Sequence, residues 1–285
     1  MAENTAKTWF ITGASAGFGR AFADYALSAG QNVVVTARRA EKLAEIEALE
    51  PDRVLAVQMD VTRPDEIAAA VGAATARFGR IDVLINNAGY GIVGAVEETP
   101  EDELRAQMET NFFGAVAVTR AVLPLMRAQR SGAVVMMSSL GGQLSFAGFG
   151  PYSASKFALE GLTEALAQEV APFGIHAMIV EPGAFRTDFA GPTALRHMPR
   201  IADYDSVVGG TRDFAAEMHG TQAGDPARAA AAIDRALSAE TPPLRLALGD
   251  DAVNAIRTHG ESLLAELAEW EPVARDVNVE ESSAA

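Results

Sequence analysis

A tyrosine and a lysine stand four residues apart in the segment GPYSASKFALEG, at positions 152 and 156. In a helix this spacing brings the two side chains to the same face. Only three of the 23 basic residues are lysines, so this chain rarely uses lysine where charge alone is needed. A phenol has an ordinary pKa of about 10, and a nearby ammonium group favours its ionised form. We therefore predict that Lys156 lowers the pKa of Tyr152 and that Tyr152 exchanges a proton with a bound molecule.

Two serines lie shortly before this pair, at the end of the apolar run AVVMMSS (133–139). Ser139 precedes Tyr152 by thirteen residues. A hydroxyl at the end of a strand can donate a hydrogen bond to a substrate oxygen and help to polarise it. Such a serine is also a common cap of the following turn. Ser139 is the second candidate catalytic residue.

A glycine-rich turn, TGASAGFG (12–19), follows the first predicted strand and opens the first predicted helix. Gly13, Gly17 and Gly19 permit a tight turn and a close approach of the backbone to a pyrophosphate, and the helix N-terminus offers free N–H groups to the phosphates. Ser15 and Phe18 belong to the same turn. The pattern predicts a dinucleotide site, with an ordinary glycine-rich turn as the alternative.

The end of the second predicted strand, VVVTARRAEKL, indicates which dinucleotide binds. Sites for NAD place a carboxylate there to accept from the ribose 2′-OH. Here Ala37 takes that place and Arg38 and Arg39 follow, which favours a 2′-phosphate and predicts NADP(H). The alternative is that the two arginines only solvate a loop. Asp60 and Val61, at the end of the third predicted strand, are candidates for the adenine side.

Short apolar runs alternate with longer helical segments along the chain. The predicted strands are 8–12, 32–37, 54–61, 82–88, 133–139, 176–182 and 244–249. The predicted helices are 17–29, 40–49, 64–78, 100–128, 151–171, 226–239 and 250–270. Consecutive apolar residues in the strands indicate a parallel sheet covered on both faces. We expect a single α/β domain over residues 1–275, with a Rossmann fold built on a doubly wound parallel sheet of about seven strands.

The segment 184–224 interrupts this alternation and follows the end of a strand, where α/β proteins bind ligands. We expect it to be a substrate-binding insertion. Apolar and aromatic residues of this segment and of the loops near Ser139 predict a pocket for a hydrophobic carbonyl or alcohol substrate. The candidates are Tyr90, Leu140, Gln143, Leu144, Phe146, Phe149, Phe185 and Phe189.

The formal net charge of −15 argues against nucleic acid and anionic membranes as partners. The chain has no cysteine, no evident signal peptide and no apolar run long enough to span a bilayer, so a cytoplasmic location is expected. Its four histidines are scattered and no metal site is expected. Residues 276–285 are expected to form an acidic flexible tail.

Together these motifs resemble those of the classical short-chain dehydrogenase/reductase family. They occur in that family's order and spacing between about residues 7 and 187. The segments that carry the resemblance are TGASAGFG (12–19), DV (60–61), NNAG (86–89), ETNFFG (109–114), SS (138–139), YSASK (152–156) and PGAFRT (182–187).

The resemblance implies roles for individual residues. It assigns the substrate hydroxyl contact to Ser139 rather than Ser138, and it implies that Lys156 also binds the nicotinamide ribose. It implies that Asn111 holds a water that links Lys156 to solvent. Further cofactor contacts are implied beneath the dinucleotide and at its nicotinamide end. These residues are Asn87, Ala88, Gly89, Pro182, Gly183, Phe185 and Thr187.

The resulting expectation is reversible, NADPH-dependent reduction of a ketone to a secondary alcohol. Two alternatives remain open: a carrier-linked 3-ketoacyl reductase of a biosynthetic pathway, and a protein that senses NADP(H) without turnover. The long helices at 100–128 and 151–171 often build subunit interfaces in the family that the motifs resemble. A homo-oligomer, tetramer or dimer, is therefore expected.

Overall fold

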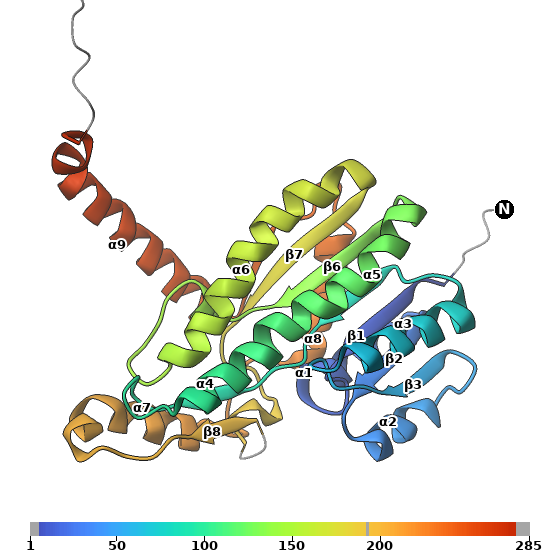
Figure 1. Ribbon diagram of the computed structural model, residues 1–285, viewed down its shortest axis with the longest axis horizontal. Helices are drawn as coiled ribbons and strands as arrows, with labels where there is room; N and C mark the ends of the chain where they lie inside the picture. Colours follow the sequence, from blue (N-terminus) through green and yellow to red (C-terminus); the bar gives the residue numbers. More distant parts are fainter. Residues whose placement is uncertain (1–5, 192–193, 278–285) are drawn as a thin grey trace, which may run out of the picture.

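Seven parallel strands form one sheet, in the order β3-β2-β1-β4-β6-β7-β9, in the computed structural model, which describes residues 6–191 and 194–277 (Figure 1). Each strand overlaps one of the seven predicted strands, so the predicted doubly wound parallel sheet is confirmed. The strands are β1 (Thr8–Thr12), β2 (Asn32–Ala37), β3 (Val54–Gln58), β4 (Val83–Asn86), β6 (Gly132–Met137), β7 (Ile175–Pro182) and β9 (Arg245–Leu248). Because all seven run in one direction, their carboxyl ends meet at one edge of the sheet.

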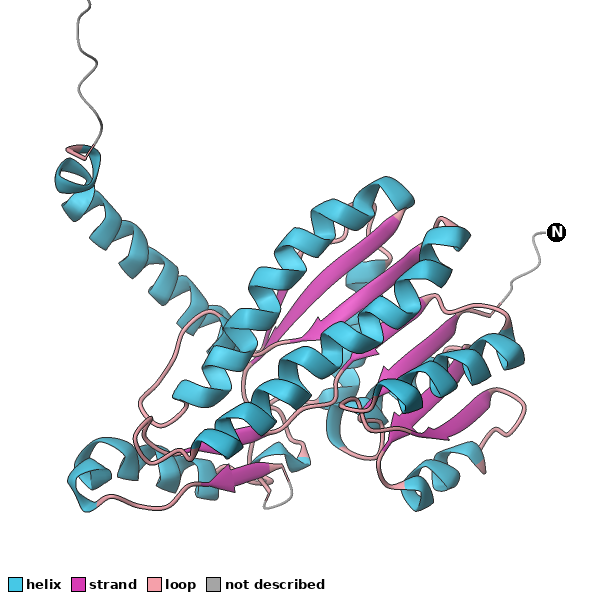
Figure 2. Ribbon diagram, viewed as in Figure 1, coloured by secondary structure: helices cyan, strands magenta, loops and turns pink. Residues whose placement is uncertain are grey.

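Helices cover both faces of the sheet (Figure 2). One face carries α1 (Gly17–Ser28), α2 (Ala40–Glu47) and α8 (Pro226–Leu237), and the other carries α3 (Pro64–Phe78), α5 (Ala115–Gln129) and α6 (Gly150–Val170).

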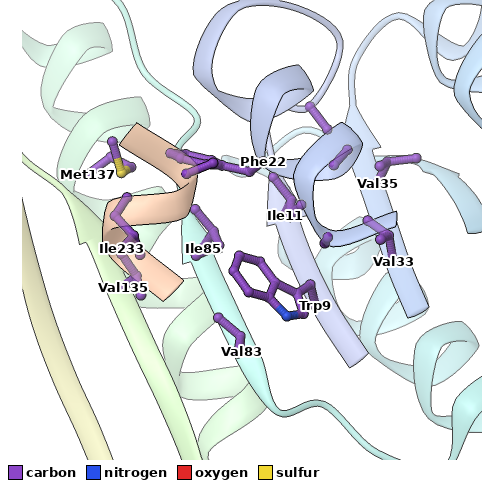
Figure 3. Packing of buried hydrophobic residues seen from close by; sticks show 14 of the residues in the cluster. Trp9, Ile11, Phe22, Val33, Val35, Val83, Ile85, Val135, Met137 and Ile233 are labelled. Atoms are coloured by element: carbon purple, nitrogen blue, oxygen red, sulfur yellow. The ribbon is translucent and has the colours of Figure 1, made fainter. Parts of the chain in front are cut away.

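Alternate residues of β1 supply the two cores. Trp9 and Ile11 pack in the core beside Phe22 of α1 and Ile233 of α8 (Figure 3), whereas Phe10 packs in the core on the opposite face. This follows from the two-residue period of a strand. Burying one aliphatic or phenyl side chain fully contributes about 1.5–3 kcal/mol. The continuous apolar pattern of β1 therefore fixes the strand at the centre of the molecule.

The order of the strands creates the binding edge. From β1 the chain passes outward to β2 and β3, then returns to β4 on the other side of β1. Ligands of doubly wound sheets bind where the strand order reverses in this way. The Thr12 hydroxyl joins the two strand ends because it accepts the backbone N–H groups of Asn87 and Ala88, at 2.9 and 3.0 Å. The glycine turn after β1 thus lies beside the NNAG segment after β4.

The single helix predicted over 100–128 is instead α4 (Glu101–Met108), a π-helical turn (Glu109–Gly114) and α5. Gly114 lies against Val61, where an added Cβ would come within 2.6 Å of Val61 Cγ2. The widened turn contains Asn111, which the sequence marked as a site residue. Turns of this kind inside α-helices are frequent at functional sites.

The insertion predicted at 184–224 contains regular structure that the sequence did not indicate. Strand β8 (Leu195–His197) pairs in parallel with β5 (Gly91–Val93), and helix α7 (Asp205–Glu217) follows. Both β8 and α7 lie at one end of the molecule, beyond the carboxyl edge of the main sheet (Figure 1). The segment therefore contains a strand and a helix and is not an irregular loop throughout.

A buried ion pair anchors this insertion to the rest of the chain. Arg212 of α7 contacts Glu98 at 2.7 Å, and their side chains are 4% and 1% exposed. The Glu98 carboxylate also accepts the backbone N–H groups of Ile201 and Ala95. These backbone bonds first, and then Arg212, lower the pKa of Glu98 to about 2. The Glu98 carboxylate therefore stays ionised at neutral pH.

Helix α9 (Asp250–Arg275) is five residues longer than predicted and projects away from the body of the protein (Figure 1). Ala252 is the one buried residue between its ends. Within the described residues, no helix has the length and apolarity needed to cross a membrane. From residue 278 onward, the predicted tail lies outside the described part of the chain.

Candidate active site

The three residues singled out first, Ser139, Tyr152 and Lys156, line one cavity of about 550 Å³. Ser139 lies two residues after the end of β6, while Tyr152 and Lys156 lie one turn apart near the start of α6. Tyr152 is 9% exposed and Lys156 is 6% exposed. The structure thus brings together, at the carboxyl edge of the sheet, a phenol, a hydroxyl and an amine.

Burial controls the ionisation of Tyr152. Removal from water raises the pKa of Tyr152 to about 12, and a hydrogen bond with Ser139 acts in the opposite direction. The phenol therefore stays protonated throughout the physiological range and has a proton to donate. The rings of Phe149 and Phe189 lie 6.3 and 5.5 Å from the tyrosine ring, centroid to centroid, and help to exclude water from it.

Lys156 does not act on Tyr152 as the sequence suggested. Its Nζ donates to the Met137 carbonyl at 2.6 Å and lies 5.7 Å from the centroid of the tyrosine ring. Burial lowers the pKa of Lys156 to about 8, against the opposing effect of Glu160. The expected lowering of the Tyr152 pKa by Lys156 is therefore wrong for the protein alone, because desolvation outweighs the charge of a distant and itself buried amine.

Ser139 caps a turn and also lines the cavity, so its place is compatible with both possibilities that the sequence left open. Its Oγ accepts the backbone N–H of Gly141 at 3.1 Å and so caps the short turn Leu140–Gly142. The same hydroxyl faces the cavity beside Tyr152. The cap fixes the serine rotamer, so the hydroxyl is held where it can reach a substrate oxygen.

Asn111 lies next to this group but makes its described hydrogen bonds to protein. Its Oδ1 accepts from the Tyr90 backbone N–H at 3.0 Å, and its Nδ2 donates to the Tyr90 carbonyl and to Ser155 Oγ. An added Cβ on Gly89 would lie 3.0 Å from Asn111 Oδ1 and 3.8 Å from Lys156 Nζ, so both side chains flank Gly89. The water-holding role stays a prediction. The bonds themselves show that Asn111 fixes the backbone of Tyr90.

The turn after β1 has the features that a pyrophosphate requires. The N-cap of α1 is Ala16, which provides no side-chain cap, and the first turn holds no acidic residue. Its N–H groups and the positive end of the helix dipole are therefore available to an anion. Gly13 and Gly17 have φ values of 66° and 54°, which favour glycine. The residues present thus fit the phosphates of a dinucleotide.

A substitution at Gly19 tests whether the glycine turn binds a dinucleotide. An added Cβ would overlap the Gly13 carbonyl oxygen and lie 2.7 Å from Asn87 Nδ2. Gly19→Ala is expected to lower the free energy of unfolding by about 1–3 kcal/mol and to weaken dinucleotide binding, because the turn must shift. Thermal denaturation and a titration monitored by NADPH fluorescence measure the two effects.

Gly161→Ala is the matched control, because no atom lies within 4 Å of an added Cβ at this exposed position in α6. Alanine there is expected to leave stability unchanged or raise it by up to about 1 kcal/mol. Equal NADPH affinities in the two variants would contradict the role of Gly19.

Of the residues predicted for the adenosine end, Arg39 contacts the glycine turn. Arg39 donates to Ser15 Oγ at 3.1 Å, which joins the end of β2 to the turn, and Arg38 is exposed beside it. Asp60 uses one carboxylate oxygen to accept from the backbone N–H and the hydroxyl of Thr62, at 2.9 and 2.8 Å. Val61 is buried in the core next to Gly114. The structure thus gives Asp60 a local turn-stabilising contact, and its adenine contact stays a prediction.

The segment after β4 is held tightly against the glycine turn. Asn87 Nδ2 donates to the carbonyl oxygens of Thr12 and Gly13, at 2.9 and 3.1 Å. Asn87 and Gly89 also line the cavity, whereas Ala88 packs against the core. Phe185 and Phe18 also line the cavity, and their rings lie 5.0 Å apart, centroid to centroid. Pro182, Gly183 and Thr187 line the cavity as well.

Most of the predicted substrate residues line the cavity, and two do not. Those that line it are Tyr90, Leu140, Phe146, Phe149, Phe185 and Phe189. Gln143 and Leu144 are not among the described lining residues. Gln143 instead donates to the carboxylates of Glu160 and Glu181, because the turn after Ser139 directs it away from the cavity. Gln143 is thus held by these carboxylates, whereas a substrate contact by Leu144 stays a prediction.

Other lining residues were missed, because they come from distant parts of the chain. Met218 and Gln222 follow α7, Leu195 begins β8, and Asp251 and Ala255 belong to α9. Asp251 Oδ2 accepts the backbone N–H of Ala184 at 2.6 Å. In the sequence, Asp251 is indistinguishable from an ordinary acidic residue in the first turn of a helix. Lys156 and Asp251 are the charged side chains among the described lining residues.

Within residues 6–191 and 194–277, no group of three or more histidines and carboxylates is arranged to hold a metal ion. The lining residues Ser139, Tyr152 and Lys156 supply a hydroxyl, a phenol and an amine, which can form hydrogen bonds and transfer a proton.

Comparison with known proteins identifies the class to which this fold and site belong. The family model described as short chain dehydrogenase matches residues 7–196. The chain is 40% identical over 266 residues to Oxidoreductase BOA17 of Botryotinia fuckeliana, covering 93% of this chain and 96% of the relative. It is 40% identical over 242 residues to a 3-ketodihydrosphingosine reductase of Bacteroides thetaiotaomicron, covering 84% of this chain and 86% of the relative.

Solved structures agree. A short-chain dehydrogenase from Streptomyces avermitilis is 53% identical with a TM-score of 0.91, covering 96% of this chain and all of that chain. A gluconate 5-dehydrogenase from Burkholderia cenocepacia, solved with NADP and tartrate, is 30% identical with a TM-score of 0.62, covering 65% of this chain and 74% of that chain. The chain belongs to the short-chain dehydrogenase/reductase family and is an oxidoreductase that acts on CH–OH and C=O groups.

Proposed function

We propose that the protein reduces a ketone with hydrophobic substituents to a secondary alcohol, reversibly, with NADPH. The observation that carries the proposal is the pairing of a protonated Tyr152 with the capped Ser139 hydroxyl on one mainly apolar cavity, beside a turn that fits a dinucleotide. A nicotinamide cofactor is supported by the family and by the relative solved with NADP.

In this proposal the residues divide the work of reduction. When bound, the reduced nicotinamide supplies a hydride to the carbonyl carbon. Ser139 donates a hydrogen bond to the carbonyl oxygen and polarises it, and Tyr152 gives that oxygen its proton. Lys156, whose pKa of about 8 keeps it mostly protonated at neutral pH, binds the nicotinamide ribose.

The preference for NADP(H) is supported by the end of β2. Ala37 stands where a carboxylate would accept from a ribose hydroxyl, and Arg38 and Arg39 stand beside the glycine turn. Arg39 already reaches Ser15, so a 2′-phosphate placed there would meet a guanidinium and a hydroxyl.

The cavity favours an uncharged, apolar substrate. Its walls carry rings from Phe146, Phe149, Phe185 and Phe189, and Asp251 would repel a carboxylate. The Bacteroides relative is named for reduction of the ketone of a long-chain lipid base, which suits walls of this kind. A carrier-linked substrate is a weaker candidate, because carrier proteins are acidic and this chain has a net charge of −15.

A homo-oligomer accords with the exposure of Phe113 and Phe157, which are about half exposed on the outer faces of the π-helical turn and of α6. Measurement of the mass in solution checks this part of the proposal.

A panel of ketones tests the proposed function. Oxidation of NADPH and of NADH, followed by nicotinamide absorbance, is expected to be fastest with apolar aryl and long-chain alkyl ketones and with NADPH. Tight NADPH binding without turnover of any ketone in the panel would favour a sensing protein instead.

A further inference from the structure

Two buried carboxyl groups lie next to the segment that carries Ser139. Glu160 lies one turn after Lys156 in α6. Glu181 is the residue before Pro182, which ends strand β7. They are 3% and 2% exposed. Residues of this kind are rarely buried unless they are paired or perform a function. Neither belongs to the cavity lining, so the proposed reduction does not use them as contacts.

The pair holds both ends of the segment that carries Ser139. Ser138 Oγ donates to Glu160 Oε1 at 2.6 Å. At the other end, Gln143 Nε2 donates to Glu160 Oε2 and, at 3.0 Å, to Glu181 Oε1. The backbone between them passes so close that an added Cβ on Gly142 would overlap Glu160 Oε1 and Ser138 Oγ. Segment 138–143 therefore rests on the two carboxyl groups.

The charges around the pair do not balance if both groups ionise. Arg245 of β9 lies 3.3 Å from Glu160 Oε2 and 3.6 Å from Glu181 Oε1, but it also contacts Glu164 at 2.8 Å. Lys156 is the other cation near Glu160, and it donates to Met137 instead. Two adjacent buried carboxylates are costly, which favours the protonated form of Glu181. Burial, and then Glu160, raise the pKa of Glu181 to about 7.

We propose that Glu160 and Glu181 are positioning residues for the proposed reduction: they hold Ser138 and Gln143 and thereby keep the Ser139 hydroxyl against Tyr152. The inference rests on the proposed function. To that function the inference adds a buried pair of carboxyl groups that supports the catalytic serine.

The protonation state gives the inference a measurable signature. When Glu181 loses its proton, two buried carboxylates face each other across Gln143, and the segment that carries Ser139 is expected to shift. Small displacements of catalytic groups reduce kcat by up to about a hundredfold. At saturating NADPH and ketone, kcat for reduction is therefore expected to fall about tenfold on going from pH 6 to pH 8.5.

Glu181→Gln is the diagnostic variant, because an amide keeps the size and the hydrogen bonds of a protonated carboxyl but does not titrate. Its kcat is expected to stay level over the same pH range. Glu164→Gln is the matched control, since Glu164 also contacts Arg245 but is half exposed. Its pH profile is expected to follow the wild type. A fall caused by Lys156 would persist in Glu181→Gln, and that result would overturn the inference.

A second variant covers failure of the first to fold. Gln143→Leu removes the link to both carboxyl groups without changing a charge, and it is expected to lower kcat while leaving the dissociation constant of NADPH within twofold. A purely structural role would lower the melting temperature and leave kcat of the folded fraction unchanged, which would also overturn the inference.

Thermal stability provides a readout that does not depend on turnover. Because the folded pKa of Glu181 lies above the unfolded value of 4.5, the folded protein binds more protons between about pH 4.5 and 7. This group therefore lowers wild-type stability as pH rises through that window. The loss is expected to be smaller in Glu181→Gln, and an identical loss would show that Glu181 keeps no proton. Absence of ketone reduction in the wild type would instead refute the proposed function alone.

Discussion

Replacing Tyr152 by phenylalanine is expected to reduce kcat for ketone reduction about 10²- to 10⁴-fold, because the proton donor is removed. The ring remains, so its contacts with Phe149 and Phe189 and the shape of the cavity persist. The dissociation constant of NADPH is expected to change little. Steady-state rates at saturating ketone and a fluorescence titration with NADPH measure the two quantities.

The matched control is Tyr25→Phe. Tyr25 also loses only a hydroxyl, which in the wild type donates to Asp234 at 2.7 Å between α1 and α8, away from the cavity. Its turnover is expected to equal that of the wild type. If Tyr152→Phe retained more than a tenth of the wild-type kcat, another group would have to supply the proton.

The direction of the pKa shift bears on the same experiment. Reduction needs the protonated phenol, and burial raises the pKa of Tyr152 to about 12. Ionisation of Tyr152 in the free enzyme is therefore not expected to limit kcat/KM for reduction at any pH below about 10. A fall in kcat nearer pH 7 has to come from another group, such as the Glu160–Glu181 pair.

The sheet could be predicted from the sequence because each strand is a short apolar run between glycine, proline or polar residues. Trp9, Phe10 and Ile11 illustrate this, since consecutive apolar residues are expected only where both faces are covered. The residues that carry the chemistry could also be predicted from the sequence, because Tyr152, Lys156 and Ser139 lie near the ends of predicted strands and helices. Short sequence patterns were sufficient to predict those elements whose structure depends mainly on neighbouring residues.

The missed features depend on contacts between distant parts of the chain. β5 and β8 have three residues each, too few to show a period, and α7 contains Gly209 and Gly210, which disfavour a helix. Asp251 reaches Ala184 from 67 residues away. Gln143 was assigned to the cavity because the sequence does not show which way a short turn points. The error on the Tyr152 pKa arose from considering charge without burial.

Exchanging the residues at the end of β2 is expected to have the second largest effect. Ala37→Asp combined with Arg38→Leu places a carboxylate where the ribose hydroxyl of NAD binds and removes one cation that would face a 2′-phosphate. A hydrogen bond to a charged group is worth about 1.5–3 kcal/mol, and an unpaired charge repels the phosphate. The ratio of kcat/KM for NADPH to that for NADH is therefore expected to fall about a hundredfold.

Paired kinetic assays with the two coenzymes and one ketone measure this ratio, and Arg235→Leu is the control for loss of a positive charge. Arg235 is exposed on α8, which packs on the same face of the sheet as α1. Removal of its charge is expected to leave the ratio unchanged. Since Arg39 still reaches Ser15 in the double variant, some affinity for NADPH is expected to persist. An unchanged ratio in the double variant would mean that the arginines only solvate the loop, and the assignment of NADP(H) would have to be given up.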